Sequence, residues 1–146
     1  MKIALGSDHL ALAMKDELVR YVESLGHEVA DCGCYNMEPV DYPDIAALVA
    51  GRIKNGEAER GILVCGTGIG MAMAANKIRG IRAAQCHDVY SAERAAKSNN
   101  AHIITLGARV VGVELAKCIV RAWLESCFSG GQSQKKIEKI MMLEQA

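Results

Sequence analysis

The chain has 146 residues, of which 51% are hydrophobic, and its 17 Lys and Arg side chains balance 17 Asp and Glu side chains. This length suffices for one domain with a buried core, and the apolar share is typical of globular proteins rather than disordered ones. A neutral chain without a basic block gives no electrostatic case for binding nucleic acid or a membrane surface. We therefore expect a single domain over residues 1–146.

Short apolar runs alternate with amphipathic segments along the chain. In chain order the sequence predicts strand 2–6, helix 9–25, strand 28–32, helix 41–55, strand 61–65, helix 68–78, strand 81–86, helix 89–98, strand 103–106, helix 111–127 and a terminal helix over about 134–144. Continuously apolar strands that alternate with helices are typical of a parallel sheet covered on both faces. The predicted fold class is α/β, a three-layer, doubly wound (Rossmann-like) fold with five parallel strands.

The terminal helix follows a break at Gly130-Gly131 and carries its own apolar residues. It can pack on a partner subunit or on its own domain, and the pattern alone leaves both open.

The six cysteines and the N-terminus bear on the compartment of the protein. The apolar run at residues 1–6 is too short for a signal peptide, and no run is long enough to cross a membrane. Without a secretory signal, the cysteines are expected to be reduced thiols. Cys32-Gly33-Cys34 lacks the second ligand pair of a zinc site. We expect a cytoplasmic protein without a metal.

The most informative stretch is residues 65–70, Cys-Gly-Thr-Gly-Ile-Gly, between the third predicted strand and a helix. Free N–H groups at a helix start can bind an anion, and a thiol there is favoured as thiolate. A base beside an anion hole is what proton abstraction next to a carbonyl requires. The alternative is a tight turn with a buried, inert Cys65. The glycine spacing fits neither a dinucleotide fingerprint nor a P-loop, so a nicotinamide site is not expected.

Polar residues follow the other predicted strands. Asp8 and His9 come after the first, Tyr42 after the second, His87 after the fourth and Arg109 after the fifth. Because ligands bind at the carboxyl ends of parallel strands, we expect these side chains to surround one crevice. Each of them also has a simpler interpretation, as a helix cap or a solvated surface residue.

Taken together, these segments resemble the type B ribose-5-phosphate isomerases, within the wider ribose/galactose phosphate isomerase family. The resemblance spans nearly the whole chain, and the matching segments are residues 2–9, 41–43, 61–70, 74–77, 80–84, 90–92 and 107–112. It implies a cofactor-free aldose–ketose isomerase that interconverts ribose 5-phosphate and ribulose 5-phosphate. It also implies a homodimer, with a tetramer as the alternative, in which the partner's fourth helix and C-terminal region complete each site.

The resemblance assigns roles residue by residue. Cys65 matches the base that abstracts the carbon-bound proton, and Thr67 with the Gly66, Gly68 and Gly70 amides matches the groups that hold the enediolate. The remaining matches are substrate contacts: Asp8 and Tyr42 to sugar oxygens, His9 and Arg109 to phosphate, and Asn99 to the substrate.

Two departures from the family pattern bear on the identity of the sugar. Ser98 stands where the family often has a histidine that opens the sugar ring, which leaves His87 and His102 as candidates for that role. Gln132 stands where a phosphate-binding arginine is common, and Lys136 could supply the charge. Galactose 6-phosphate and allose 6-phosphate remain alternative substrates. A weakly catalytic sugar-phosphate-binding subunit is a third possibility.

Overall fold

The structure, a computed structural model, describes residues 1–145. In chain order its elements are β1 (Lys2–Ser7), the 3₁₀ turn η1 (His9–Ala11), α1 (Leu12–Ser24), β2 (Glu28–Asp31), α2 (Tyr42–Lys54), β3 (Arg60–Cys65), α3 (Ile69–Asn76), β4 (Ala83–Gln85), α4 (Val89–Lys97), β5 (Ile103–Gly107), α5 (Val113–Leu124) and α6 (Gln132–Leu143). Within the described residues, no helix is long and apolar enough to cross a membrane.

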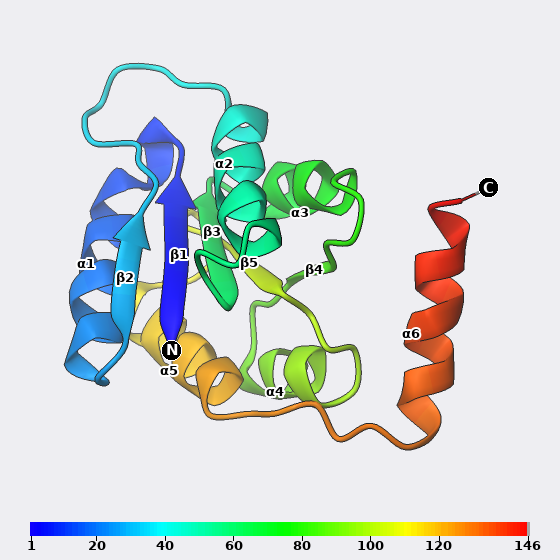
Figure 1. Ribbon diagram of the computed structural model, residues 1–146. Coiled ribbons are helices and arrows are strands. Elements are labelled where there is room, and N and C mark those ends of the chain that lie inside the picture. The colour runs from blue at the N-terminus through cyan, green and yellow to red at the C-terminus, as the bar shows by residue number, and fades with distance from the viewer. Residues whose placement is uncertain (146) are drawn as a thin grey trace.

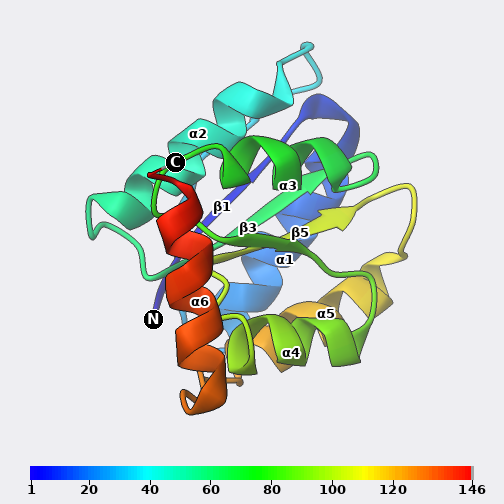
Figure 2. The same ribbon diagram turned by 90° about the vertical axis from the view of Figure 1, so that its right-hand side faces the viewer.

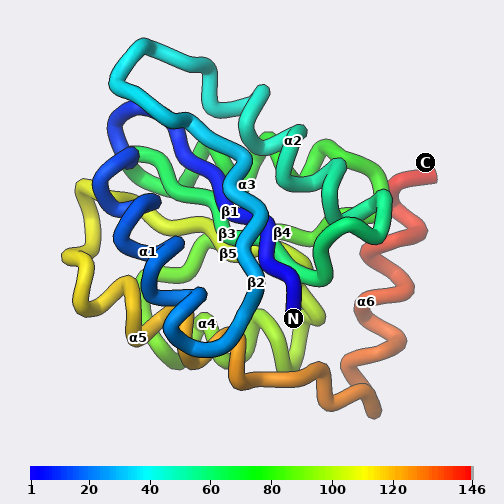
Figure 3. The backbone as a smooth tube through the Cα atoms, turned by 60° about the vertical axis from the view of Figure 1, so that its left-hand side comes forward, coloured from blue at the N-terminus to red at the C-terminus, as the bar shows by residue number. Residues whose placement is uncertain are grey.

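The five strands form one parallel sheet in the order β2-β1-β3-β5-β4. Helices α1, α4 and α5 cover one face of the sheet, and α2 and α3 cover the other (Figures 1 and 2). The predicted three-layer, doubly wound fold is therefore confirmed. All five strands run in the same direction, so their carboxyl ends lie on the same side of the molecule. The long loop between β2 and α2 lies on this side too (Figure 3).

The central strands contribute side chains to two hydrophobic cores, one on each face of the sheet, because successive side chains point to opposite faces. In β3, Ile62 and Val64 pack in the cluster with α1, α4 and α5, whereas Leu63 and Cys65 pack in the cluster with α2 and α3. The Cys65 side chain therefore lies on the sheet face that α3 covers.

Some element ends differ from those predicted. The first helical segment begins as the separate turn η1, because Asp8 caps it by accepting a hydrogen bond from the Ala11 N–H at 3.2 Å. The predicted strand 81–86 pairs only over β4, an edge strand with one neighbour. Helix α6 starts at Gln132, two residues earlier than predicted, directly after Gly131.

Helix α6 stands apart from the two helical layers (Figures 1 and 2). It contacts its own chain along one side: Ile137 is buried, Met141 accepts a hydrogen bond from the Arg82 guanidinium, and the Glu144 carboxylate accepts two from the Gly80 N–H at 2.9 and 3.0 Å. These residues follow the spacing of one helical face.

Candidate active site

The carboxyl ends of β1, β3 and β5 and the first turns of α2 and α3 enclose a hollow of about 430 Å³. Its lining brings together residues that the sequence places on four different segments: Asp8, Leu10, Tyr42, Cys65, Gly66, Thr67, Ile69, Gly70, Met73 and Arg109. The crevice predicted at the strand exits is therefore present with Asp8, Tyr42 and Arg109 in its lining, whereas His9 and His87, which were also expected there, do not line it. It contains a thiol, a carboxyl, a phenol and a guanidinium.

Cys65, the last residue of β3, is 5% exposed. Its sulfur accepts a hydrogen bond from the Gly68 N–H at 3.1 Å, and the Thr67 hydroxyl accepts one from the Ile69 N–H at 3.2 Å. Helix α3 begins at Ile69, so its N-terminal amides point toward this loop. The Cys65 sulfur therefore lies beside the N-terminal end of α3, with one backbone amide directed at it.

Two glycines allow the loop to approach its neighbours closely. Gly68 has a φ of +76°, in the left-handed region that glycine adopts readily. At Gly70, an added Cβ would lie 2.5 Å from the Tyr42 ring, so only glycine lets that ring rest against the start of α3. The Tyr42 phenol therefore forms one wall of the hollow and lies against the glycine loop.

Asp8 and Arg109 supply opposite charges to this hollow. Asp8 is 6% exposed, and its Oδ1 atom caps η1 while Oδ2 makes no hydrogen bond within residues 1–145. The Arg109 backbone N–H donates to the Gly66 carbonyl at 3.0 Å, which fixes the arginine beside the glycine loop. Its side chain forms no ion pair with the described residues and is exposed. A carboxylate oxygen and a cation thus remain available to a ligand.

His9 and His87 each hold a backbone amide instead of lining the hollow. The His9 Nδ1 atom accepts from the Val40 N–H at 3.2 Å, which ties the loop before α2 to η1. The His87 Nε2 atom accepts from the Gly107 N–H at 2.9 Å, at the end of β5. Each ring has one nitrogen engaged in this way, so only the other nitrogen is available for proton transfer.

Ser98, Asn99, His102 and Lys136 lie away from the hollow of their own chain. Ser98 and Asn99 follow α4, and the Asn99 carbonyl accepts a hydrogen bond from the Arg82 guanidinium at 3.3 Å. His102 directly precedes β5 and so lies at the amino ends of the strands, whereas Cys65 lies at their carboxyl ends. Lys136 lies on α6. The residues singled out by the sequence therefore fall into two groups, one around Cys65 and one remote from it.

His102 is held as a neutral ring. Its Nδ1 atom accepts a hydrogen bond from the Arg82 N–H at 3.1 Å. Burial, together with the nearby Arg82 guanidinium, lowers the pKa of His102 to about 4. Near neutral pH this imidazole has no extra proton to give, which makes it a poor general acid.

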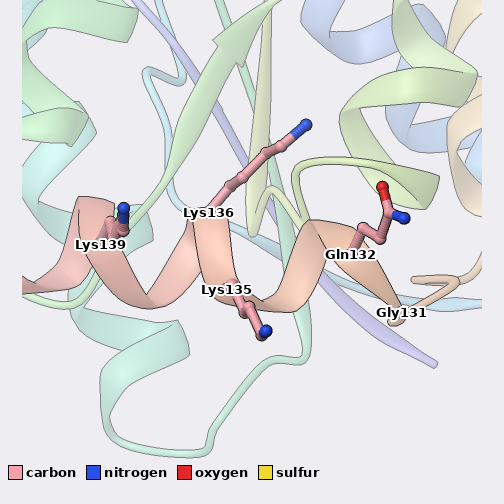
Figure 4. A pocket seen from close by; sticks show the side chains of 5 residues that line it. All are labelled: Gly131, Gln132, Lys135, Lys136 and Lys139. Carbon is pink, nitrogen blue, oxygen red and sulfur yellow. The ribbon is translucent and has the colours of Figure 1, made fainter.

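A second hollow, of about 660 Å³, is formed by α6 and is lined by Gly131, Gln132, Lys135, Lys136 and Lys139 (Figure 4). Gln132, Lys136 and Lys139 project from one side of the helix, and Lys135 projects from the other (Figure 4). No lysine of this set forms an ion pair within residues 1–145. This surface is cationic and contains no thiol, carboxyl or hydroxyl group, so it offers binding but not the chemistry of the Cys65 hollow.

Sequence reasoning missed two residues that hold the glycine loop. The Gln85 side-chain amide donates to the Thr67 carbonyl at 2.8 Å, and the Thr105 hydroxyl donates to the Gly68 carbonyl at 2.8 Å. Thr105 is the one polar residue in the otherwise apolar run 103–106, and this was the signal that could have identified it. Gln85 carried no comparable signal.

The groups that line the hollow are suited to proton transfer. Among residues 1–145, no three His, Cys, Asp or Glu side chains gather in a way that could hold a metal ion. The hollow combines a thiol, backbone amide donors and polar side chains, and groups of these kinds are what proton abstraction beside a carbonyl requires. Fold and site together define an isomerase of the aldose–ketose class.

The chain belongs to the Ribose/Galactose Isomerase family, whose profile matches residues 3–140. It is 53% identical to the D-erythrulose-4-phosphate isomerase of Pectobacterium atrosepticum, over 96% of this chain and 93% of that protein. It is 52% identical to the Ribose-5-P isomerase B of Listeria innocua, over 99% and 98%. The solved structure of the ribose-5-phosphate isomerase B of Clostridium thermocellum superposes with a TM-score of 0.97 at 46% identity, covering 99% of this chain and 98% of that one.

Proposed function

We propose that this chain interconverts ribose 5-phosphate and ribulose 5-phosphate, with Cys65 as the base. The observation that carries the proposal is the hydrogen bond from the Gly68 N–H to the Cys65 sulfur at 3.1 Å, at the bottom of a hollow that also presents Asp8 and Tyr42. A thiolate held by an amide beside a helix N-terminus is a base next to an anion site. The Listeria relative, matched over nearly its full length, supports the choice of sugar.

In the proposed reaction the Cys65 thiolate takes the proton from C2 of the open-chain aldose, and the electron pair of that bond forms the cis-enediolate as the C1 carbonyl oxygen gains charge. Return of the proton from sulfur to C1, with transfer of the hydroxyl proton between O2 and O1, gives the ketose. The amides at the start of α3 stabilise the enediolate more than the neutral sugar, which lowers the barrier. The free Asp8 oxygen and the Tyr42 hydroxyl would orient the sugar hydroxyls.

The substrate phosphate would be bound by Arg109 and by the ring nitrogen of His9 that the Val40 amide does not engage, with Lys136 supplied by a second copy of the chain. Lys136 is remote from Cys65 within one chain, and its side chain is exposed on α6. We therefore propose a homodimer in which α6 and the segment around Asn99 complete the partner's site. The α6 hollow, with three lysines and no acidic partner in the described chain, has the charge that a sugar phosphate requires.

A four-carbon sugar phosphate is the second candidate substrate, and the residue at 98 favours it. Ser98 is too weak an acid or base to open a sugar ring near neutral pH. Of the other candidates, His102 is half-buried at the amino end of β5, and His87 has one nitrogen engaged by the Gly107 N–H. An aldotetrose 4-phosphate has no free hydroxyl placed to close a five-membered ring, so it needs no ring opening. The Pectobacterium relative carries the name of such an isomerase.

A panel of sugar phosphates tests both proposals. We would measure kcat/KM in both directions with ribose 5-phosphate, erythrose 4-phosphate, galactose 6-phosphate and allose 6-phosphate and their ketoses, with EDTA present. The first proposal expects the pentose pair to be turned over fastest, and the second expects the tetrose pair. Turnover of none of them, or equal use of unphosphorylated sugars, would count against both.

We also propose that the protein works in the cytoplasm. All six cysteines are free thiols in the structure, and two of them, Cys118 and Cys127, are exposed. Exposed free thiols are typical of a reducing compartment.

A further inference from the structure

Two side chains outside the hollow hold two successive peptide groups of the glycine loop. Gln85 on β4 and Thr105 on β5 are register partners in the parallel sheet, so their side chains project from the same face. Gln85 donates to the Thr67 carbonyl and Thr105 donates to the Gly68 carbonyl, each at 2.8 Å. One pair of neighbouring strand residues thus fixes both carbonyls of the Thr67-Gly68 turn.

Each of these contacts continues through the peptide group to one candidate catalytic residue. The peptide that contains the Thr67 carbonyl also contains the Gly68 N–H, which donates to the Cys65 sulfur at 3.1 Å. The peptide that contains the Gly68 carbonyl also contains the Ile69 N–H, which donates to the Thr67 hydroxyl at 3.2 Å. Because a peptide group is planar, fixing its oxygen also fixes the direction of its N–H. A bond at the oxygen also polarises the N–H and strengthens the bond that it donates.

The surroundings of Gln85 and Thr105 indicate that these side chains have a role beyond packing. Thr105 is completely buried in a strand whose other members are apolar, and a buried hydroxyl is costly unless it is hydrogen-bonded. The Gly68 carbonyl already accepts the helical hydrogen bond from the Ala72 N–H at 3.1 Å. The Thr105 hydroxyl is therefore an additional donor to a carbonyl that already has a hydrogen-bond partner. Gln85 is exposed, so its contact contributes little to the core.

We propose that Gln85 and Thr105 are positioning residues for the isomerase, each acting through one peptide group, Gln85 on the Cys65 sulfur and Thr105 on the Thr67 hydroxyl. This inference rests on the proposed roles of Cys65 and Thr67. It assigns separate effects to the two residues, which allows each half to be tested alone.

The Gln85 half is tested with Gln85→Met, which keeps the length of the side chain and removes the donor. The rate of Cys65 alkylation by iodoacetamide is followed against pH by mass spectrometry of the Cys65 peptide, with exposed Cys118 as the internal control. We expect the midpoint of the Cys65 profile to move to higher pH, and kcat to fall by about 3- to 10-fold with KM unchanged. A wild-type midpoint and a wild-type kcat would overturn this half.

The Thr105 half is tested with Thr105→Val, which keeps the shape of the side chain, and with Thr105→Ser, which keeps the hydroxyl. We expect the valine variant to lose about 3- to 10-fold in kcat while its Cys65 alkylation profile stays at the wild-type position, and the serine variant to regain most of the loss. Equal loss in both variants, or no loss in the valine variant, would show that Thr105 serves packing only.

The alkylation profile separates failure of this inference from failure of the proposed function. It reports on the sulfur itself and needs no turnover. If Cys65→Ala remained active, the proposed chemistry would fail, but a shifted profile in Gln85→Met would still establish the contact through the peptide group. If Cys65→Ala were inactive and the Gln85→Met profile unshifted, the inference alone would fail.

Discussion

The polar residues of the hollow owe their positions to local backbone contacts. Asp8 was open to two interpretations from the sequence, a cap and a ligand, and its Oδ1 atom does cap η1 while Oδ2 remains unbonded within residues 1–145. Tyr42 reaches the glycine loop only because position 70 has no side chain. Small changes of shape at this scale should therefore have large effects on turnover.

Gly70→Ala tests the close approach of Tyr42. The new Cβ would lie 2.5 Å from the Tyr42 ring, so the phenol must move away from the hollow. We expect kcat/KM to fall by about 10-fold or more, because misplacement of about 1 Å at a site can cost this much or more. Gly51→Ala in α2 is the matched control: nothing lies within 4 Å of its new Cβ, so it should keep full activity. Equal activity of the two variants would contradict the role given to Tyr42.

Arg109→Ala tests the cation beside the glycine loop. A hydrogen bond to a charged group contributes about 1.5–3 kcal/mol, so KM for the sugar phosphate should rise by about 10-fold or more. Arg79→Ala changes the same residue type at an exposed position after α3 and should leave KM unchanged. Steady-state kinetics with the best substrate of the panel give KM for the two variants and for the wild type. An unchanged KM in Arg109→Ala would remove this arginine from the phosphate site.

At the scale of elements, the strand–helix alternation predicts every strand and helix, because apolar runs and amphipathic periods are local signals. The ends of elements are less predictable. Strand β4 is short because an edge strand pairs on one side only, and the 3₁₀ turn before α1 depends on a cap that forms in the folded chain. The sequence also did not indicate that Thr105 and Gln85 hold the loop, since their pairing arises from the sheet register.

The turn between α4 and β5 should make stability depend on pH through His102. Burial with the nearby Arg82 lowers the pKa of His102 to about 4 in the folded chain, against about 6.5 in an unfolded chain. As the pH falls below about 6.5, the unfolded state binds a proton that the folded state cannot, so the free energy of unfolding decreases until about pH 4. The difference corresponds to about 3 kcal/mol at most.

His102→Asn checks this pH dependence, since the asparagine oxygen can still accept from the Arg82 N–H. Urea unfolding is measured for wild type and variant at neutral and at acid pH, and contributions of other groups cancel in the comparison. We expect the wild type to lose more stability on acidification than the variant. Parallel losses would contradict the burial of a neutral His102.

At the scale of the whole molecule, the residues identified from the sequence divide between two surfaces of one chain. The Cys65 hollow and the lysine side of α6 are separate, and the position of α6 outside the helical layers explains why (Figure 2). The sequence resemblance implied this division, but no local pattern in the chain indicates it. In a single chain, a residue that contacts a partner subunit is simply an exposed apolar or charged residue. The sequence therefore does not distinguish it from other surface residues.

Mixing two inactive variants tests whether subunits share a site. Cys65→Ala and Lys136→Ala homodimers would each lack one component in both sites, whereas a mixed dimer would hold one intact site. After unfolding and refolding together, we expect activity well above that of either variant alone, and light scattering should give the mass of a dimer. The absence of any gain in a mixture shown to contain mixed dimers would confine Lys136 to a role within its own chain.

The central claim, that Cys65 is the base of an aldose–ketose isomerase, is tested most directly by the turnover of Cys65→Ala. Loss of a general base typically costs about 100-fold or more, so we expect kcat on the preferred sugar phosphate to fall at least that far while circular dichroism and Tm stay near wild type. Cys118→Ala, which removes an exposed thiol on α5, should keep full activity. Near-normal turnover by a folded Cys65→Ala enzyme would contradict the account.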